Sequence, residues 1–190
     1  AANEDLDSYP KTINKDLLLL KEKNVDAVFV PTAEKMYNQK PDNHFFKSEL
    51  SYKLEGKSRP HFFKGVTTIV HKLLNIVNPT HTVFGQKDAQ QLLIVEQMIK
   101  EKHPYIYLIK GPIIRNSRGL ALSSRNNYLS KENNVIASNI YTGLMRLKSS
   151  LDNGNKKAES LKRIFSDFIS KFPGFSIDYI SIADTQTLEE

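Results

Sequence analysis

Cysteine is absent from the sequence of 190 residues. Its absence excludes disulfide bonds and thiolate chemistry and favours a reducing compartment, so we expect a cytoplasmic protein. No stretch is apolar for long enough to cross a bilayer, and we therefore expect no membrane partner. The start of the chain has neither the charged nor the apolar region of a signal peptide. It also has no initiator methionine, so we expect the chain to be a piece of a longer protein.

Two common nucleotide-binding fingerprints are also missing. Gly85 belongs to neither a GxGxxG nor a GxxxxGK[ST] pattern, which excludes the dinucleotide fingerprint and the P-loop. His44, His71, His81 and His103 show no spacing typical of a metal site. The net charge of +6 is compatible with a nucleic acid, a polyphosphate or a solvated lysine-rich surface. Because the lysines are spread along the chain and no helix is rich in arginine, we expect no nucleic-acid partner.

What is present is a strong alternation of apolar segments over residues 1–111. The patterns predict helices over residues 12–24, 61–77 and 89–100, strands over 27–30, 82–84 and 105–109, and an edge strand or hairpin arm over 45–54. Strands that alternate with helices imply an α/β fold with a mostly parallel, doubly wound, Rossmann-like sheet. In such sheets, ligands bind beyond the carboxyl ends of the strands.

The pattern changes after Gly111-Pro112, where we place a domain boundary. Residues 1–111 are predicted to form a partial Rossmann-like ligand-binding domain. Residues 112–190 are predicted to form a smaller α+β domain. Its predicted strands cover residues 113–119 and 175–182, and two helices lie between them with Gly154 in the loop that joins them.

The segment at 84–91, Phe-Gly-Gln-Lys-Asp-Ala-Gln-Gln, lies where a strand ends and a helix begins. A helix N-terminus attracts anions but not lysine, so Lys87 is best explained as a phosphate contact, with a solvated lysine as the alternative. Asp88 either holds Mg²⁺ against phosphate oxygens or complements the helix dipole. Gln91, one turn later, either hydrogen-bonds a small hydroxy acid or is exposed.

Three further sites carry possible chemistry. Ser123, Ser124 and Arg125 supply two hydroxyls and a guanidinium that can grip a triphosphate, although such a sequence is also common in loops. Arg59 either binds a carboxylate or phosphate or lies on the surface of a turn. His61 is either a base or phosphate donor, or a residue packed at the start of a helix.

Five segments, at 3–12, 54–60, 65–70, 84–91 and 119–126, together resemble the pantothenate synthetase (pantoate–β-alanine ligase) family in order and spacing. The resemblance implies a homodimeric, ATP- and Mg²⁺-dependent ligase with the class I adenylyltransferase fold. In this family pantoate attacks the α-phosphate of ATP, and the amine of β-alanine then displaces AMP from pantoyl adenylate. The partners implied are pantoate, β-alanine and ATP.

The resemblance also implies roles for individual residues. Lys87 would contact the phosphates, Asp88 the metal and Gln91 pantoate, with Arg59 and His61 also on the substrate side. Residues 122–125 would be a mobile phosphate-gripping segment, and Ile114 would contact adenine through its backbone. The implied catalytic residues are Lys87, Ser123, Ser124 and Arg125, and the implied ATP site consists of Gly85, Gln86, Lys87, Asp88, Ile114, Leu122, Ser123, Ser124 and Arg125.

The sequence departs from the family pattern in three ways. The N-terminal family segment Met-Gly-x-Leu-His-x-Gly-His is absent, Arg59-Pro60-His61-Phe62-Phe63 replaces Arg-Pro-Gly-His-Phe, and the family pattern continues beyond Glu190. We therefore expect this chain to be an inactive piece of an active enzyme. Two alternatives stay open: a non-catalytic nucleotide-binding or dimerisation module, and another nucleotidyltransferase of the same superfamily.

Overall fold

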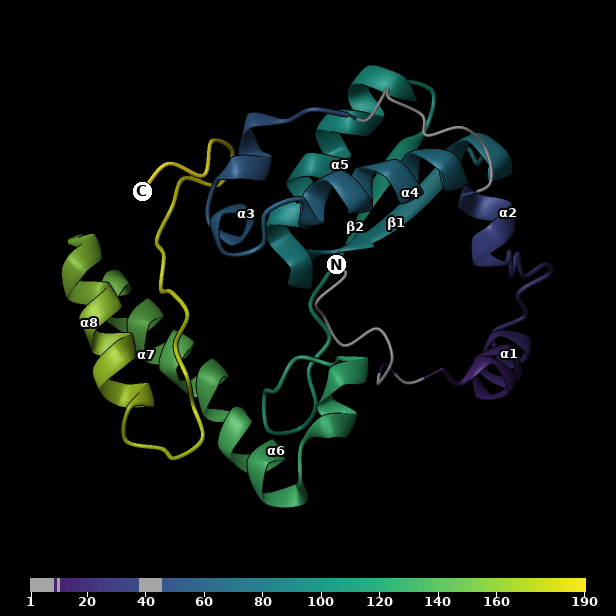
Figure 1. The fold of residues 1–190 in the computed structure, drawn as a ribbon. Coiled ribbons are helices and arrows are strands. Elements are labelled where there is room, and N and C mark those ends of the chain that lie inside the picture. Colours follow the sequence, from purple (N-terminus) through teal and green to yellow (C-terminus); the bar gives the residue numbers. More distant parts are fainter. Residues whose placement is uncertain (1–8, 10, 38–45) are drawn as a thin grey trace.

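The computed structural model describes residues 9, 11–37 and 46–190 (Figure 1). The helices near the start are α1 (Ile13–Glu22) and α2 (Ala33–Tyr37). Helix α1 lies at one end of the molecule, whereas α2 contacts the rest of the chain, because the Lys72 ammonium donates to the Met36 carbonyl at 2.8 Å. The predicted helix over residues 12–24 is thus confirmed. Residues 38–45, which include the first residue of the predicted strand over 45–54, lie outside the described residues.

A two-stranded parallel sheet lies at the centre of the first part. Strand β1 (His81–Gly85) pairs with β2 (Tyr107–Gly111) in a register that sets His81 beside Tyr107 and Gly85 beside Gly111. The connection between the strands contains α5 (Ala89–Lys102). A helix in this position is the usual connection between parallel strands, because they need a long crossover.

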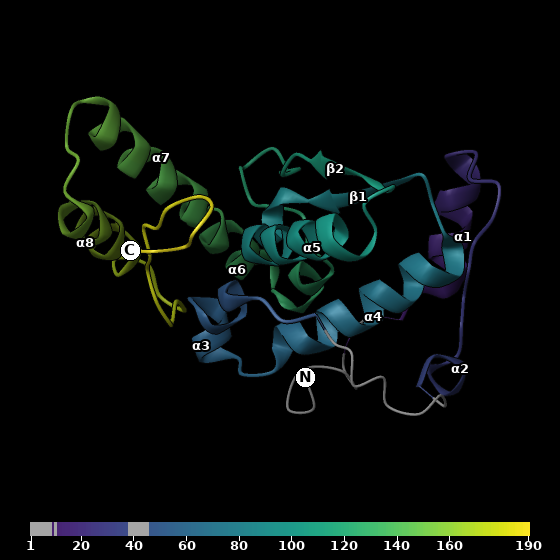
Figure 2. The ribbon, with the colours of Figure 1, turned by 90° about the horizontal axis from the view of Figure 1, so that it is seen from above.

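Helices α4 (Phe62–Val77) and α5 cover one face of this sheet (Figure 2). Their core contains Leu74, Val95, Met98 and Ile99, and Phe84 and Leu108 of the strands pack against it. Asn78 ends α4 in a left-handed conformation, as the Asn-Pro sequence predicts. The periodic apolar faces of residues 61–77 and 89–100 therefore predicted both helices correctly.

Among the described residues the opposite face of the sheet is exposed, and the doubly wound arrangement stays a prediction. Val83, Tyr107 and Ile109 keep 65%, 70% and 47% of their surface accessible. The α/β class and the parallel strands are confirmed, whereas the larger Rossmann-like sheet stays a prediction. No helix among the described residues is long and apolar enough to cross a membrane.

Four predicted strands are wrong. Residues 27–30 are irregular and exposed, and residues 113–119 contribute only an isolated bridge between Arg115 and Ala121. Within 46–54 the chain instead forms the 3₁₀ helix η1 (Glu49–Tyr52), because Ser48 accepts a hydrogen bond from the Leu50 amide. Residues 175–182 also form no strand. Alternating apolar residues make a strand only where a neighbouring strand pairs with them, and no described strand lies beside these segments.

The second part consists mainly of helices. They are α6 (Lys131–Ala137), α7 (Asn139–Asp152) and α8 (Ala158–Ile169), so the first predicted helix is split in two. Helix α7 packs against α8 through Gly143, where an added Cβ would lie 2.9 Å from the Phe165 ring. Gly154 joins these helices at φ +92°, as its place in the predicted loop suggests. The α+β prediction for residues 112–190 is therefore corrected to helices with irregular connections.

An irregular C-terminal tail, residues 170–190, runs from α8 back to the first part (Figure 1). Leu188 packs there with Leu50, Phe63 and Ile94 in a second core cluster. The Lys53 ammonium donates to the Thr187 carbonyl at 2.8 Å and pairs with Glu189. The tail therefore connects the two predicted parts by contacts that sequence patterns do not show.

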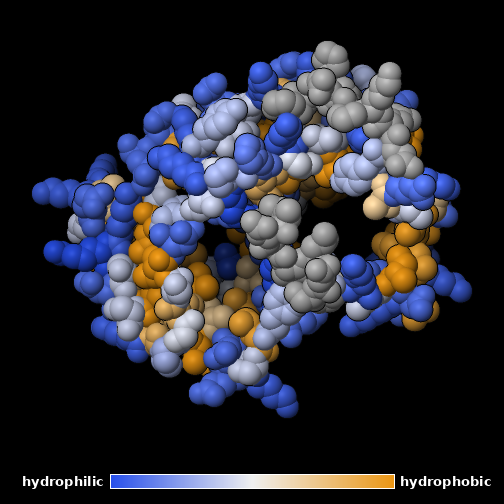
Figure 3. All heavy atoms as spheres, viewed as in Figure 1, coloured by the Kyte–Doolittle hydropathy of each residue, from blue (hydrophilic) through white to orange (hydrophobic). Residues whose placement is uncertain are grey.

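Besides the exposed face of the sheet, Figure 3 shows apolar surface on α1 and on α7. Leu18 and Leu19 of α1 are 64% and 48% exposed. Ile140 and Leu144 of α7 are 39% and 42% exposed. Neither place contains a predicted site residue.

Candidate functional site

A cavity of about 480 Å³ lies where four segments of the chain meet. The segments are the turn around α3 (Glu55–Ser58), the start of α5, the 3₁₀ helix η3 (Ser124–Tyr128) and the C-terminal tail. The lining residues are Leu54, Glu55, Arg59, Phe62, Phe63, Lys87, Asp88, Ala89, Gln90, Gln91, Arg125, Tyr179 and Leu188. Arg59, Lys87, Asp88, Gln91 and Arg125, all predicted site residues, thus share one cavity.

One wall is the turn that follows β1. Gly85 ends the strand, and the 3₁₀ helix η2 (Gln86–Asp88) leads directly into α5. The Lys87 ammonium lies 3.1 Å from Asp88 Oδ1, and both side chains are exposed to the cavity. Gly85 and Gln86 precede this pair without lining the cavity themselves. The turn lies at the carboxyl end of a parallel strand, the position where ligands of α/β proteins bind.

Arg59 lines the cavity from the end of α3. It caps the C-terminus of α3, and its Nη1 donates to Glu55 Oε1 at 3.2 Å. The guanidinium carbon lies 3.6 Å from the centroid of the Phe62 ring. An ion pair and an aromatic face therefore fix the orientation of this cation.

Gln90 of α5 connects this helix to the neighbouring η1–α3 turn by hydrogen bonds. Its Nε2 donates to the carbonyls of Leu50 and Lys53 at 2.7 and 2.8 Å, and its Oε1 accepts from the Glu55 amide at 3.1 Å. Three hydrogen bonds from one side chain thus hold the η1–α3 turn against α5. Nothing in its residue type distinguishes Gln90 from the neighbouring Gln91, so sequence reasoning missed this role.

The predicted phosphate-gripping segment reaches the cavity through one residue. Arg125 lines it, whereas Ser123 and Ser124 are not among its lining residues. Ser123 Oγ instead accepts from the Arg125 amide at 3.3 Å and so caps η3. Ile114 and Leu122, predicted on the ATP side, lie next to each other because the Leu122 amide donates to the Ile114 carbonyl at 2.9 Å.

His61 lies elsewhere. It is exposed, adopts a left-handed conformation with φ 73°, and lines a separate hollow of about 290 Å³. Its neighbour Phe62 lines the main cavity instead. Close by, Gly56 is required by packing, because an added Cβ would lie 2.0 Å from the Ser51 carbonyl oxygen.

The tail adds a residue that the sequence patterns did not single out. The Tyr179 hydroxyl donates to Glu55 Oε2 at 3.1 Å, and both residues line the cavity. Partial burial of the phenol first, and the nearby Glu55 carboxylate second, raise the pKa of Tyr179 to about 12 although 43% of the residue surface stays exposed, so the phenol stays neutral. The alternating pattern around Asp178-Tyr179 pointed to a strand and thereby concealed this contact.

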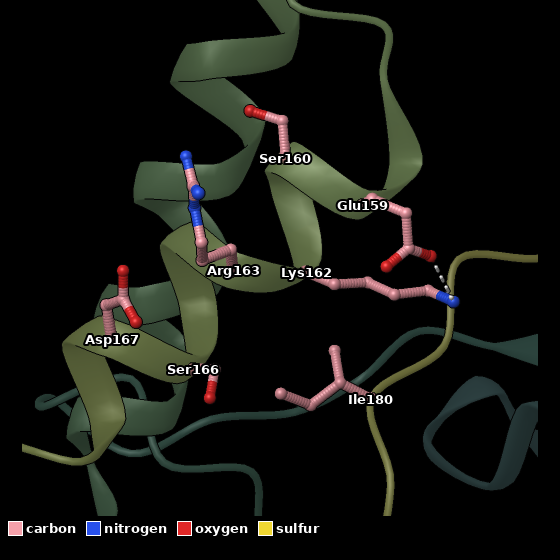
Figure 4. Close-up of a pocket in the computed structure, with 7 residues that line it drawn as sticks. All are labelled: Glu159, Ser160, Lys162, Arg163, Ser166, Asp167 and Ile180. Atoms are coloured by element: carbon pink, nitrogen blue, oxygen red, sulfur yellow. Dashed lines mark ion pairs between the residues drawn. The ribbon is translucent and has the colours of Figure 1, made fainter.

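A second hollow, of about 650 Å³, lies between α8 and Ile180 (Figure 4). Its lining mixes both charges, and Lys162 is paired with Glu159 at 3.4 Å and with Glu190 at 2.7 Å. One of its two lining cations is therefore already paired, and the lining also contains the carboxylates of Glu159 and Asp167, which disfavour an anion. No predicted site residue lines it.

No group of three metal-ligating side chains occurs among residues 9, 11–37 and 46–190. Asp88 is a carboxylate on the cavity wall that can share a cation with bound phosphates. Mg²⁺ is commonly held in this way, by one or two carboxylates together with phosphate oxygens. The residues present therefore fit a metal that enters with a nucleotide.

Comparison with known proteins identifies the family. A family model described as Pantoate-beta-alanine ligase matches residues 1–190. The chain belongs to this family. Pantothenate synthetase from Thermosipho africanus is 42% identical over 187 residues, which cover 98% of this chain and 67% of that protein. Pantothenate synthetase from Caldicellulosiruptor bescii is also 42% identical, over 98% of this chain and 66% of that protein.

Solved structures give the same result for the fold. Pantothenate synthetase from Thermus thermophilus superimposes with a TM-score of 0.90 at 34% identity, over 99% of this chain and 68% of that one. The pantoate–β-alanine ligase from Francisella tularensis, in complex with beta-gamma ATP and β-alanine, gives a TM-score of 0.70 at 33% identity, over 86% and 61%. The family predicted from the motifs is confirmed. The chain spans about two thirds of the length of these relatives.

Proposed function

We propose that the protein to which this chain belongs condenses pantoate with β-alanine, using ATP and releasing AMP and pyrophosphate. The observation that carries the proposal is the cavity at the end of β1. It brings three cationic side chains, Arg59, Lys87 and Arg125, together with the amide of Gln91. Two anionic substrates that must react with each other need such a collection of positive charge.

In the first step, a pantoate carboxylate oxygen forms a bond to the α-phosphorus of ATP, and the bond to pyrophosphate breaks. Lys87 would neutralise the charge that develops on the phosphates, and Arg125 would stabilise the departing pyrophosphate. Gln91 would hydrogen-bond pantoate, and Arg59 would bind an anionic group beside it. The main contribution of the protein is therefore position and electrostatic stabilisation.

Ser123 and Ser124 belong to this step only through a change of conformation. They lie next to Arg125 but are not among the lining residues. Closure of the segment at 122–125 over bound ATP would bring their hydroxyls to the phosphates. Ile114 and Leu122, with Gly85 and Gln86, would complete the nucleotide site in that closed form.

Asp88 is the residue proposed to share Mg²⁺ with the phosphates. A bound Mg²⁺ would supply further charge neutralisation at the phosphate oxygens. The ion pair between Lys87 and Asp88 holds both side chains at the same turn. Lys87 would then exchange Asp88 for a phosphate oxygen when the nucleotide binds.

In the second step, the amine nitrogen of β-alanine forms a bond to the acyl carbon of pantoyl adenylate, and AMP leaves. Adenylation makes this possible because a free carboxylate is a poor acyl donor. The ligands in the Francisella tularensis relative, beta-gamma ATP and β-alanine, support two of the three substrates. We place this enzyme in the cytoplasm as a homodimer with the Rossmann-like fold of class I adenylyltransferases.

The decisive experiment measures pyrophosphate release by the full-length protein that the gene encodes. Release is expected only when ATP, Mg²⁺ and pantoate are present together. Lys87→Ala should lower kcat about 100-fold, because it removes a cation that stabilises the transferring phosphate. Lys102→Ala, at the far end of α5 and paired there with Glu101, is the matched control and should keep full activity.

An unchanged rate in Lys87→Ala would contradict the site assignment. Release with a different acid or nucleotide from a substrate panel would instead identify another nucleotidyltransferase. The 190-residue chain itself is expected to bind pantoate or ATP without turnover. Turnover by this chain alone would exclude the non-catalytic module as its role.

A further inference from the structure

The cavity wall contains a chain of three polar groups that ends at Arg59. The Tyr179 hydroxyl donates to Glu55 Oε2 at 3.1 Å, and Glu55 Oε1 accepts from Arg59 Nη1 at 3.2 Å. The two carboxylate oxygens thus have different partners, one from the tail and one from the cavity wall. Rotation of the carboxylate would break both contacts, so each contact stabilises the other.

The backbone around Glu55 is fixed independently of its side chain. Gln90 binds the Glu55 amide and the carbonyls of Leu50 and Lys53. Gly56, the next residue, fits closely against the Ser51 carbonyl. The Glu55 side chain therefore starts from a rigid point, and its orientation is set by the two groups that it contacts.

The tail that carries Tyr179 is anchored on the same turn. Leu188 is 9% exposed within the cluster of Leu50, Phe63 and Ile94, and Lys53 binds the Thr187 carbonyl. Phe62 closes the remaining side by packing its ring against the Arg59 guanidinium. An arginine held between an aromatic ring and a carboxylate presents its planar group in one orientation, which suits a planar oxyanion.

We propose that Glu55 and Tyr179 are positioning residues that orient Arg59 toward an oxyanion in the cavity, either the pantoate carboxylate or a phosphate of ATP. The proposal rests on the proposed function. It makes the C-terminal tail part of the binding site although the tail supplies no cation to the cavity. Docking of the tail and affinity for the oxyanion are then linked.

The test measures binding rather than turnover, so it uses the 190-residue chain. Isothermal titration with pantoate and, separately, with ATP and Mg²⁺ shows which oxyanion Arg59 contacts. For that ligand, Glu55→Gln should weaken binding about tenfold and Tyr179→Phe about threefold, as expected when a charge-assisted contact loses its fixed geometry. Tyr107→Phe, on the exposed face of β2, is the matched control and should bind like the wild type.

A double-mutant cycle separates positioning from a general structural role. If Glu55 acts through Arg59, Glu55→Gln should change affinity less than about twofold in an Arg59→Ala background. An equal loss in both backgrounds would overturn the proposal. A second readout is the NMR signal of the Arg59 side-chain Nε–Hε group without ligand. It should shift in Glu55→Gln and Tyr179→Phe but not in Tyr107→Phe, and an unchanged signal in all three would also overturn it.

Failure of the proposal is distinguishable from failure of the proposed function. A wild-type chain that binds neither pantoate nor ATP would contradict the function, and the positioning role with it. A wild-type chain that binds, with Glu55→Gln and Tyr179→Phe binding equally well, would contradict the positioning role alone.

Discussion

The two sides of the cavity are built differently. The base, residues 46–111, contains a parallel strand pair covered by α4 and α5, and its Ile94, Val95 and Met98 have no exposed surface. The cover, residues 112–190, consists of helices α6 to α8 and irregular segments, and it reaches the cavity through Arg125, Tyr179 and Leu188. A base with a completely buried core can hold a ligand in register, while a cover that reaches the cavity through few side chains is suited to closing over it.

The largest expected difference between the base and the cover is in the free energy of unfolding. Met98→Ala removes a completely buried side chain of the base and should lower the free energy of unfolding by about 3 kcal/mol. Met145→Ala on α7, where the side chain is 45% exposed, should change it by less than about 0.5 kcal/mol. Urea unfolding of both variants gives the comparison, and equal losses would show that base and cover are packed alike.

A medium loss of stability is expected in the cover, where α7 packs against α8. Gly143→Ala places a Cβ 2.9 Å from the Phe165 ring, which must shift. The expected loss is about 1 kcal/mol, because an overpacked contact is partly relieved when a side chain can move. The same urea unfolding assay measures this loss. Gly154→Ala is not a suitable control, because the φ of +92° at Gly154 would strain a residue that has a Cβ. A loss as large as that of Met98→Ala would mean that the cover is as rigid as the base.

The smallest expected effect is a pH dependence of stability that arises in the base. His103 is buried, its Nε2 lies 2.8 Å from His71 Nδ1, and its Nδ1 faces the Tyr105 hydroxyl at 3.5 Å. Burial first, and the neighbouring His71 second, lower the pKa of His103 below its ordinary value of 6.5. The neutral ring is favoured in the folded state, so stability is complete above pH 6.5 and falls as the pH drops toward the lowered pKa.

Urea midpoints measured between about pH 8 and pH 5 test this expectation. The wild type should lose stability only below the ordinary pKa, and His103→Gln should lose less over the same interval. His81→Gln, an exposed residue at the start of β1, serves as the control. A wild-type midpoint that stays constant over the whole interval would contradict the assigned burial of His103.

The base could be predicted from the sequence and the cover largely could not. The apolar periods of residues 61–77 and 89–100 matched α4 and α5 because both helices bury one face in the same core. The strands over 113–119 and 175–182 were wrong because an alternating pattern does not specify a partner strand. The same limit explains the incorrect strand over 27–30 and the described part, 46–54, of the predicted edge strand.

The site residues do not follow this division between base and cover. Arg59, Lys87, Asp88, Gln91 and Arg125 all line the cavity, and their roles stay predictions. Lys87 stood out because a helix N-terminus does not favour lysine, whereas the role of Gln91 came from the family resemblance. Gln90 and Tyr179 were missed because their roles are hydrogen bonds to residues 35 to 124 positions away along the chain. His61 was placed on the substrate side because the family pattern has a histidine at the next position, which is Phe62 here. Phe62 lines the cavity, whereas His61 adopts a left-handed conformation and lines a separate hollow.

The central claim is that the cavity at the end of β1 holds the substrates. The most direct measurement is NMR amide-shift mapping of the 190-residue chain titrated with pantoate and with ATP and Mg²⁺. The largest shifts are expected at Arg59, Lys87, Gln91 and Arg125, with little change along residues 159–167 of α8. Shifts concentrated on α8 beside the larger hollow, and none at Lys87 or Gln91, would contradict the claim.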